Sequence, residues 1–457
     1  MQIPVELFKE IKAAVWTRRR LVKSVVSLAP VALTTPTRAA EQLATTPMPE
    51  PYSQSVLPTG VRSRFVDNVN GLRVHVLEAG FGAGSRPCVL LLHGFPELSF
   101  SWRKVMKPLA DAGFHVLAPD LRGYGRTTGW DDRYDTDLRS FGLLNYVKDA
   151  LGLVSAFGYR SVAAVVGHDF GSVVAPWCSI ARADVFRSVV LMSAPFAGAP
   201  ALEFNTAAGS NKPENSSGEN LDDTLAKLSP PRKQYRAYYS TREANTDMIR
   251  APQGLRAFLR GYYHMKSADW TPNKPFRLTS RTAGEFAKLP TYYVMELNKN
   301  MPDSVAPAMP SASEIAACRW LPDSELSVYV GEYERTGFQG GLHGYRVRLT
   351  AAHNAELQLF SNRTIDVPSM FIGGKSDWGV YQTPGAFESM QKAACTQMES
   401  VHLIDGAGHW VQQEQPEAVT HLLLQFLRNR HALPPKKVSP PVCGSLLRID
   451  NGQHRSA

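Results

Sequence analysis

Gly167-His168-Asp169-Phe170-Gly171 carries the strongest structural signal in this sequence. This pentapeptide follows an apolar run at residues 162–166 and precedes a helical stretch at 172–180. A Gly-x-Asp-x-Gly sequence between a buried strand and a helix has the form of a nucleophile elbow, a strained turn whose crowded backbone requires glycine. We therefore predict that Asp169 is a catalytic nucleophile at the end of a strand. The alternative is that Asp169 only caps the following helix, a common role for Asp.

Apolar runs like the one before the pentapeptide recur along the chain. They occupy residues 88–92, 114–118 and 189–192, and two further strands are predicted at 368–372 and 400–404. Helical stretches such as 101–112 and 141–157 lie between them. Strands that are apolar throughout and are separated by helices predict an α/β fold, with a mostly parallel sheet covered by helices on both faces. A hairpin is predicted at residues 62–78, where Asn70-Gly71 supplies a tight turn.

The alternation of strands and helices is interrupted once. It stops near residue 196 and resumes near residue 367. We therefore expect a core formed by residues 55–195 and 367–433, with a mostly helical cap inserted at 196–366. Residues 1–50 are expected to be a targeting or disordered segment, and 434–457 a disordered basic tail.

Composition and charge exclude several classes of function. The 457 residues are 44% hydrophobic and 20% charged, which is ordinary for a globular enzyme, and no apolar run is long enough to cross a bilayer. The net charge of +9 is confined to the ends, because residues 1–40 and 428–457 each carry +5 and the rest carries −1. This distribution argues against a nucleic-acid surface. The five cysteines are widely spread without metal-ligand spacing, so we expect no metal.

The N-terminus contains the one targeting signal in the sequence. Residues 17–23 resemble a twin-arginine export motif, a weakly apolar stretch follows at 24–35, and Thr37-Arg38-Ala39 is a candidate cleavage site. This pattern predicts export to the periplasm. The alternative is a basic amphipathic helix or a transit peptide, with a cytoplasmic location if export does not occur.

Two further strand ends supply partners for Asp169. Asp377 follows the apolar run at 368–372, and His409 lies in a glycine-rich loop after the run at 400–404. The order nucleophile, acid, histidine is that of the α/β-hydrolases. We predict that His409 activates the attacking water and that Asp377 orients it. Asp405 is a rival acid, although it lies only four residues from His409 on the same loop.

An aspartate in the nucleophile position restricts the chemistry. A serine that attacks saturated carbon forms an ether, which water activated by histidine does not open. A carboxylate that attacks the same carbon forms an ester, and water then attacks the enzyme's own Cγ and releases an alcohol. Asp169 therefore suits the opening of an epoxide or the expulsion of a halide.

The loop His93-Gly94-Phe95-Pro96-Glu97 follows another predicted strand. In this fold, such a loop supplies one backbone N–H of the oxyanion hole and the residue after the nucleophile supplies the other. These would be the amides of Phe95 and Phe170, whose rings would form apolar walls. Core packing of the two rings is compatible with this role.

Together these segments resemble a known family, the α/β-hydrolase fold epoxide hydrolases. The similarity lies in HGFPE at 93–97, Ser101-Trp102, DLRGYG at 120–125, GHDFG at 167–171, the KSDWG segment around Asp377 and GAGHW around His409. It covers residues 60–195 and 340–430 well and is loose through the cap.

The resemblance implies hydrolysis of an epoxide to a vicinal diol by water, with no cofactor. It also implies that two cap tyrosines, Tyr235 and Tyr345, hold the epoxide oxygen, and that Trp102 is among the residues that bind substrate. For Tyr235 the alternative is aromatic packing with its neighbours Tyr238 and Tyr239.

Two other functions remain open at this point. A haloalkane or haloacid dehalogenase would share the aspartate nucleophile, but the Phe170 side chain has no N–H to donate to a halide. A ligand sensor without turnover would not need the triad and two tyrosines. The sequence also departs from the family pattern: Phe170 stands where Trp is common, His343-Gly344 where a bulkier aromatic is usual, and residues 209–223 form a polar insertion.

Overall fold

The computed structural model describes residues 48–82, 86–202 and 220–430. The predicted export signal, its cleavage site and the basic tail lie outside these residues, as does most of the polar insertion. The described residues from Glu50 onward belong to one compact unit. None of the helices in this part of the chain combines the length and apolar character that crossing a bilayer requires.

A mixed eight-stranded sheet forms the centre of this unit. Its order is β1 (Val61–Val69), β2 (Leu72–Ala79), β4 (His115–Pro119), β3 (Cys88–Leu92), β5 (Ala164–His168), β6 (Val189–Met192), β9 (Ser369–Gly374) and β10 (Met398–Ile404). β1 and β2 form the predicted hairpin, and β2 pairs antiparallel with β4. Every pair from β4 to β10 is parallel, which confirms the expected mostly parallel sheet.

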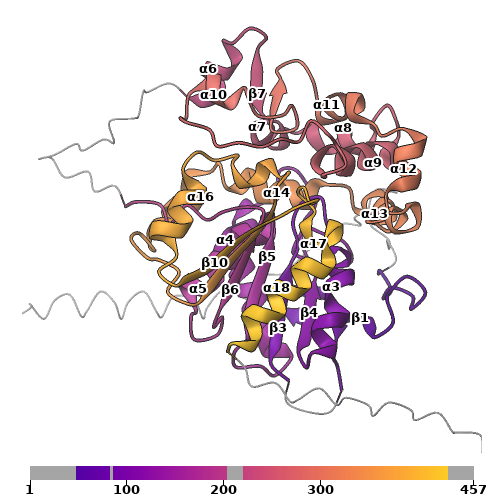
Figure 1. The fold of residues 1–457 in the computed structure, drawn as a ribbon, viewed down its shortest axis with the longest axis vertical. Helices are drawn as coiled ribbons and strands as arrows, with labels where there is room; N and C mark the ends of the chain where they lie inside the picture. The colour runs from indigo at the N-terminus through magenta and orange to yellow at the C-terminus, as the bar shows by residue number, and fades with distance from the viewer. Residues whose placement is uncertain (1–47, 83–85, 203–219, 431–457) are drawn as a thin grey trace, which may run out of the picture. The chain divides into compact units, whose positions relative to one another are not determined.

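Helices cover both faces of the sheet, as the uninterrupted apolar strands predict. On the core they are α3 (Arg103–Asp111), α4 (Leu143–Ala156), α5 (Phe170–Ala181), α16 (Ala386–Ser389), α17 (Val411–Glu414) and α18 (Pro416–Arg428), with short turns η1 (Ser99–Trp102), η2 (Leu138–Phe141), η4 (Trp378–Val380) and η5 (Met390–Ala394). α3 packs against α18 and α4 packs against α5, on opposite faces (Figure 1). All residues of β3 and β5 are buried between them.

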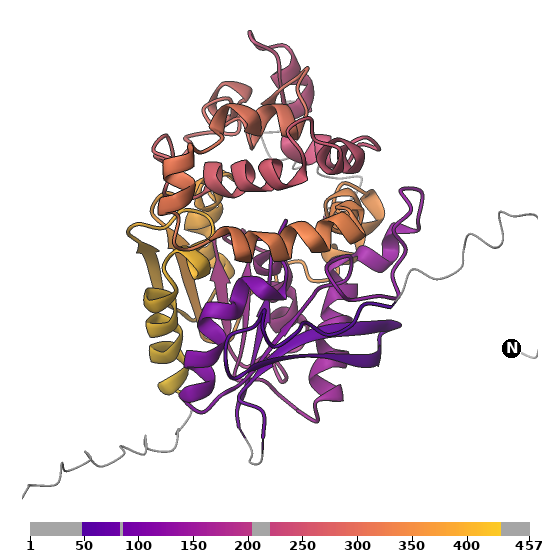
Figure 2. The same cartoon turned by 90° about the vertical axis from the view of Figure 1, so that its right-hand side faces the viewer.

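The chain between β6 and β9 forms a separate, mostly helical layer. Its elements are α6 (Leu221–Ala226), β7 (Arg232–Gln234), α7 (Tyr235–Tyr239), α8 (Ala244–Ile249), α9 (Leu255–Lys266), α10 (Ala283–Phe286), β8 (Val294–Glu296), α11 (Met301–Val305), η3 (Ala306–Ala308), α12 (Ala312–Ala317), α13 (Asp323–Thr336), α14 (Gln339–Val347) and α15 (Ala351–Gln358). Figure 2 shows this pink-to-orange layer over one end of the sheet. α14 packs against η2 of the core and against α7, so it joins the two layers.

Candidate active site

Asp169 lies at the tight turn between β5 and α5. Its backbone has φ 50° and ψ −110°, a strained conformation for a residue with a side chain. A Cβ on Gly167 would lie 2.1 Å from the Gly171 carbonyl oxygen, so the turn tolerates only glycine at that position. The Asp169 side chain makes no capping hydrogen bond to α5. The alternative role as a helix cap is therefore wrong, and the strained turn holds the carboxylate free for other partners.

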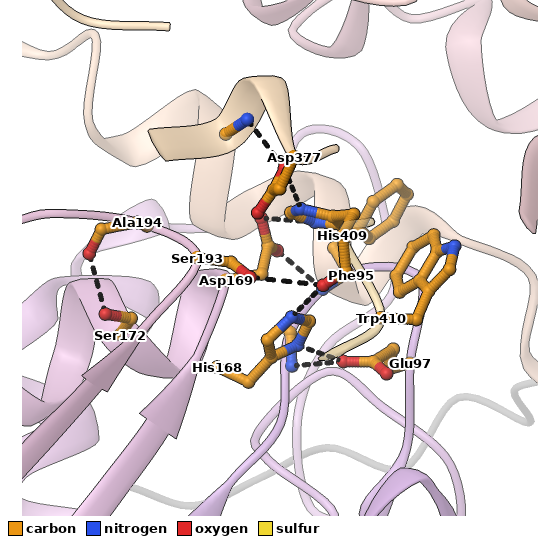
Figure 3. Close-up of polar contacts among 12 residues, drawn as sticks. Phe95, Glu97, His168, Asp169, Ser172, Ser193, Ala194, Asp377, His409 and Trp410 are labelled. Carbon is orange, nitrogen blue, oxygen red and sulfur yellow. Dashed lines mark hydrogen bonds and ion pairs between the residues drawn. The ribbon is translucent and has the colours of Figure 1, made fainter. Parts of the chain in front are cut away.

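Three of the residues singled out from the sequence meet at the carboxyl edge of the sheet. Asp169 follows β5, Asp377 follows β9 and His409 follows β10 (Figure 3). His409 Nε2 lies 3.4 Å from Asp169 Oδ2, and His409 Nδ1 lies 3.0 Å from Asp377 Oδ1. The Gly379 N–H donates to the same Asp377 oxygen at 2.6 Å. The histidine is thus held between the two carboxylates.

The rival acid, Asp405, is directed away from His409. Its side chain is 83% exposed and forms an ion pair with Lys375 Nζ at 2.7 Å. The side chain of Asp377, by contrast, is 1% exposed. A carboxylate stabilises an imidazolium most strongly where water does not screen it, so the geometry favours Asp377 over Asp405.

The charges of these three groups support one another. Burial acts to raise the pKa of Asp169, but the hydrogen bond and charge of His409 hold it well below its usual value. Burial and the nearby Lys266 ammonium act to lower the pKa of His409, yet the Asp377 and Asp169 carboxylates outweigh them and raise it. The pKa of Asp377 is lowered because His409 outweighs its burial. The resting site therefore contains two ionised carboxylates around a histidine that holds its proton more tightly than usual.

The loop after β3 supplies a donor to the nucleophile. The Phe95 N–H donates to Asp169 Oδ1 at 2.9 Å, which is the contact expected of an oxyanion-hole donor. The Phe170 N–H, the second expected donor, makes no hydrogen bond to Asp169 among the described residues. Because Phe170 is the first residue of α5, its N–H can donate to an oxygen other than those of Asp169. Both phenylalanine rings are buried, and each packs against Tyr345.

The expectation for Trp102 is not met. The residue lies in η1 and its side chain is fully buried beneath the surface of the core. It is not among the residues that line the cavity at Asp169. Trp102 therefore packs in the core and does not reach this cavity.

A cavity of about 380 Å³ opens over Asp169. Its walls include Phe170 and the two predicted tyrosines, Tyr235 at the start of α7 and Tyr345 in α14. The two tyrosine rings meet edge to face, with centroids 5.9 Å apart. The Tyr235 hydroxyl donates to Gln382 Oε1 at 3.3 Å. The structure thus brings two phenols from separate cap helices to the cavity that contains the nucleophile.

A buried ion pair between His168 and Glu97 lies next to the triad, and neither residue was a predicted site residue. His168 Nδ1 donates to Glu97 Oε2 at 2.6 Å, and its Nε2 donates to the His409 carbonyl at 2.7 Å (Figure 3). Both ring nitrogens of His168 are therefore occupied by partners that accept hydrogen bonds. Gln412 and Gln413 donate to the other Glu97 oxygen at 3.0 and 2.8 Å. The glutamate of HGFPE and the histidine of GHDFG therefore fix the backbone that carries His409.

Lys266 is a second residue that sequence patterns did not reveal. It ends α9, is 4% exposed, and its ammonium lies 5.0 to 5.7 Å from the centres of four aromatic rings. Its carbonyl accepts the His409 N–H at 2.8 Å. Burial lowers the pKa of Lys266, and the carboxylates of Asp169 and Asp377 oppose that effect. No spacing in the sequence predicts this contact, because the cage draws rings from separate cap segments and from the His409 loop.

Phe170 and Gly344 both depart from the family pattern, and the two residues lie next to each other. A Cβ on Gly344 would lie 2.8 Å from Phe170 Cζ. The absence of a side chain at position 344 therefore gives the Phe170 ring its space beside the nucleophile. The ring also packs edge to face on Tyr146 at a centroid distance of 5.2 Å.

Gly344→Ala is expected to destabilise the fold by about 1–3 kcal/mol, the usual cost of forcing a methyl group into a packed site. Urea unfolding monitored by circular dichroism measures the change. In a Phe170→Leu background the same substitution should cost clearly less, because the clashing ring carbon is gone. An equal cost in both backgrounds would contradict the packing argument.

Among the described residues, no group of three or more His, Cys, Asp or Glu side chains is arranged to hold a metal ion. The groups at the site are instead a carboxylate nucleophile, a histidine with its orienting acid, an N–H donor and two phenols. Such a set is chemically suited to nucleophilic substitution followed by hydrolysis with water.

Comparisons with known proteins show which family the chain resembles. A family model described as alpha/beta hydrolase fold matches residues 87–416. Epoxide hydrolase A of Mycobacterium tuberculosis is 33% identical over 367 residues, which cover 80% of this chain and 96% of that protein. Epoxide hydrolase B of the same organism is 30% identical over 383 residues, which cover 79% and 96%.

Solved structures give the same result. An epoxide hydrolase from an endophytic Streptomyces matches with a TM-score of 0.64 and 29% identity, covering 81% of this chain and 96% of that one. Potato (Solanum tuberosum) epoxide hydrolase I matches with a TM-score of 0.60 and 27% identity, covering 81% and 99%. The similarity extends over nearly the whole length of these relatives, so it includes the insert as well as the sheet.

Proposed function

The chain belongs to the α/β-hydrolase fold epoxide hydrolases, and on this premise we propose that it opens an epoxide to a vicinal diol through a covalent ester on Asp169. The observation that carries the proposal is the position of Asp169, which has a histidine–aspartate pair on one side and two phenols in the cavity above it.

In the first step, an Asp169 carboxylate oxygen attacks an epoxide carbon. The ester C–O bond forms as the epoxide C–O bond breaks, and the released oxygen takes a proton from a tyrosine. Burial and the charge of Asp169 raise the pKa of Tyr345 well above its ordinary value, so this phenol keeps its proton until an alkoxide forms. Hydrogen bonds from Tyr235 and Tyr345 would stabilise the developing negative charge.

In the second step, water attacks Cγ of the Asp169 ester and His409 takes its proton. Ester formation removes the negative charge of Asp169, which is one of the two carboxylates that raise the pKa of His409. The imidazole therefore releases its proton more readily in the intermediate than in the resting enzyme, which suits a general base. The Phe95 N–H would hold the oxyanion at Cγ. As this species collapses, the departing diol oxygen takes the proton from His409, and the second proton of the water, now on the Asp169 carboxyl group, returns to the tyrosinate formed in the first step.

Incubation with styrene oxide and, separately, with 1-bromobutane separates this function from its rivals. We expect diol from the epoxide and no bromide release from the alkyl halide, because the Phe170 ring offers no N–H to a departing halide. Bromide release without diol would favour the dehalogenase. Binding of styrene oxide without turnover would favour a ligand sensor.

Tyr345→Phe and Tyr235→Phe are each expected to slow formation of the ester by about 10- to 100-fold, because each removes one hydrogen bond to the developing alkoxide. Rapid-quench single turnovers with styrene oxide measure this step. Tyr238→Phe is the matched control, since its hydroxyl lies on the same helix but donates to Asp247 at 3.0 Å. If Tyr235→Phe behaves like this control, Tyr235 has only a packing role.

A further inference from the structure

Lys266, at the end of α9, is the one buried lysine among the residues that the structure describes. Its ammonium faces the rings of Tyr262, Tyr292, Tyr293 and Trp410 and makes no ion pair or hydrogen bond within that part of the chain. The negative face of an aromatic ring stabilises a cation, whereas a neutral amine gains little from it. The four rings therefore form a cage that holds a positive charge inside the protein, although burial opposes that charge.

The cage lies against the loop that carries His409. The centre of the Trp410 ring is 5.5 Å from the Lys266 ammonium and 4.7 Å from the centre of the His409 ring, so one indole contacts both the cation and the base (Figure 3). The Lys266 carbonyl accepts the His409 N–H at 2.8 Å. A Cβ on Gly408 would lie 2.5 Å from the carbonyl carbon of Ser267, so the two backbones touch. The end of α9 thus fixes the ammonium beside the histidine loop.

The charge of Lys266 acts on the base of the hydrolytic step. Burial acts to lower the pKa of His409, and the Lys266 cation adds to this effect. In the resting site the carboxylates of Asp377 and Asp169 outweigh both influences. Esterification removes the negative charge of Asp169 and leaves the cation in place. The balance at His409 then shifts toward the neutral imidazole, which is the form that accepts a proton from water.

Three other ionisable groups lie around His409. Glu97 pairs with His168, whose Nε2 lies 2.7 Å from the His409 carbonyl oxygen. The Glu414 carboxylate accepts the backbone N–H groups on either side of His409 at 2.9 Å each, and burial raises its pKa to about 8. None of the three is altered covalently when the ester forms. All of them are also present in any variant of Lys266, so a difference between such variants reports on the lysine charge.

We propose that Lys266 is a positioning residue for the hydrolytic step, whose caged ammonium keeps His409 neutral once Asp169 is esterified. The inference rests on the proposed function and adds a residue to it. Lys266 is not among the residues that line the cavity at Asp169, so it acts through His409. The proton that His409 gives up after the ester forms passes to bulk water, and His409 regains one from water when the Asp169 carboxylate is restored.

The test measures formation and decay of the Asp169 ester separately, by rapid quench with styrene oxide and denaturing mass spectrometry. Lys266→Met removes the charge and keeps an unbranched apolar stem for the cage. We expect ester decay to slow by about 3- to 30-fold near about pH 6, the effect of one charge in a protein interior. Near about pH 9 the decay should approach the wild-type rate, because the imidazole is then neutral in both proteins. Ester formation should change much less than decay.

Two further variants are the controls. Lys266→Arg keeps a cation in the cage and should lie closer to wild type at the acidic end of the profile than Lys266→Met does. Lys375→Met removes a lysine charge whose side chain is 54% exposed, and it should keep the wild-type profile because solvent screens that charge. Lys266→Gln, which is also uncharged, replaces Lys266→Met if that variant does not fold.

Each contrary outcome has one meaning. Ester decay that is slowed equally at every pH would mean that Lys266 only packs, and unchanged decay would mean that its charge does not reach His409; either overturns the inference. Slower ester formation with unchanged decay also overturns it, because it places the charge in the first step. If the wild type forms no ester, the proposed function fails as well. An ester that forms and decays without the pH-dependent difference removes only the role of Lys266.

Discussion

Asp169→Ala is expected to reduce kcat for epoxide opening by roughly ten-thousandfold to a millionfold, the range found when a catalytic nucleophile is deleted. The side chain stands alone at a turn with φ 50°, and His409 and Phe95 are both oriented on its oxygens. Without the carboxylate no ester forms, and the residual groups only polarise the epoxide. Diol formation under saturating styrene oxide measures the loss.

Asp405→Ala is the matched control for this experiment. It removes a carboxylate from the same edge of the molecule, but one that is exposed and paired with Lys375. We expect its kcat to stay within about twofold of wild type, since surface ion pairs contribute little. Retention of even a hundredth of wild-type activity in a folded Asp169→Ala variant would contradict the role of Asp169 as nucleophile.

His409→Gln is expected to stop the reaction at the ester. The first step needs Asp169 and the phenols, whereas the second needs a base at the position of His409 Nε2. Steady-state kcat should fall roughly ten-thousandfold, as when the base of a triad is removed. Denaturing mass spectrometry should show the protein with one added epoxide mass, located on the peptide that contains Asp169.

Two results would contradict this account of His409. One is continued turnover, which would assign the base to another group. The other is the absence of an adduct in a folded variant that has lost turnover, which would place His409 in the first step. The Asp169→Ala/His409→Gln double variant is the control, because it should form no adduct under the same conditions.

Much of the core was predictable because short segments of the sequence determine its strands and its tight turn. Strands buried on both faces must be apolar at every position, so β3 and β5 are recognisable as short uninterrupted runs. The turn at Gly167 and Gly171 requires glycine for steric reasons that a five-residue pattern expresses. Asp377 follows the buried strand β9 and His409 follows its half-buried neighbour β10, and the parallel sheet brings these strand ends together.

The cap was harder to predict, because its helices are short and their contacts come from distant segments. Tyr235 and Tyr345 were identified by resemblance alone, and no periodicity separates Tyr235 from its neighbours in α7. The cage around Lys266 and the pairing of Gly344 with Phe170 depend on tertiary packing that one sequence does not encode locally. Trp102 shows the opposite error: membership in a family motif suggested contact with substrate, but the side chain is core.

Arg236 and Arg348, which both line the cavity at Asp169, illustrate the same limit. Arg236 is adjacent to a predicted site residue and Arg348 lies three positions after another, yet nothing in the sequence indicates that both face one cavity. Charge in a cavity is a property of the assembled walls. The charge of this cavity can be assessed only when the positions of α7, the end of α14 and the turn at Asp169 are known.

A single turnover in ¹⁸O-labelled water, with enzyme in excess over styrene oxide, tests the covalent mechanism most directly. The account predicts that the first-formed diol contains no label, because its new oxygen comes from the Asp169 carboxylate, and that one labelled oxygen appears in the peptide that contains Asp169. Label in the first-formed diol, with an unlabelled Asp169 peptide, would mean that water attacks the epoxide directly and would contradict the account.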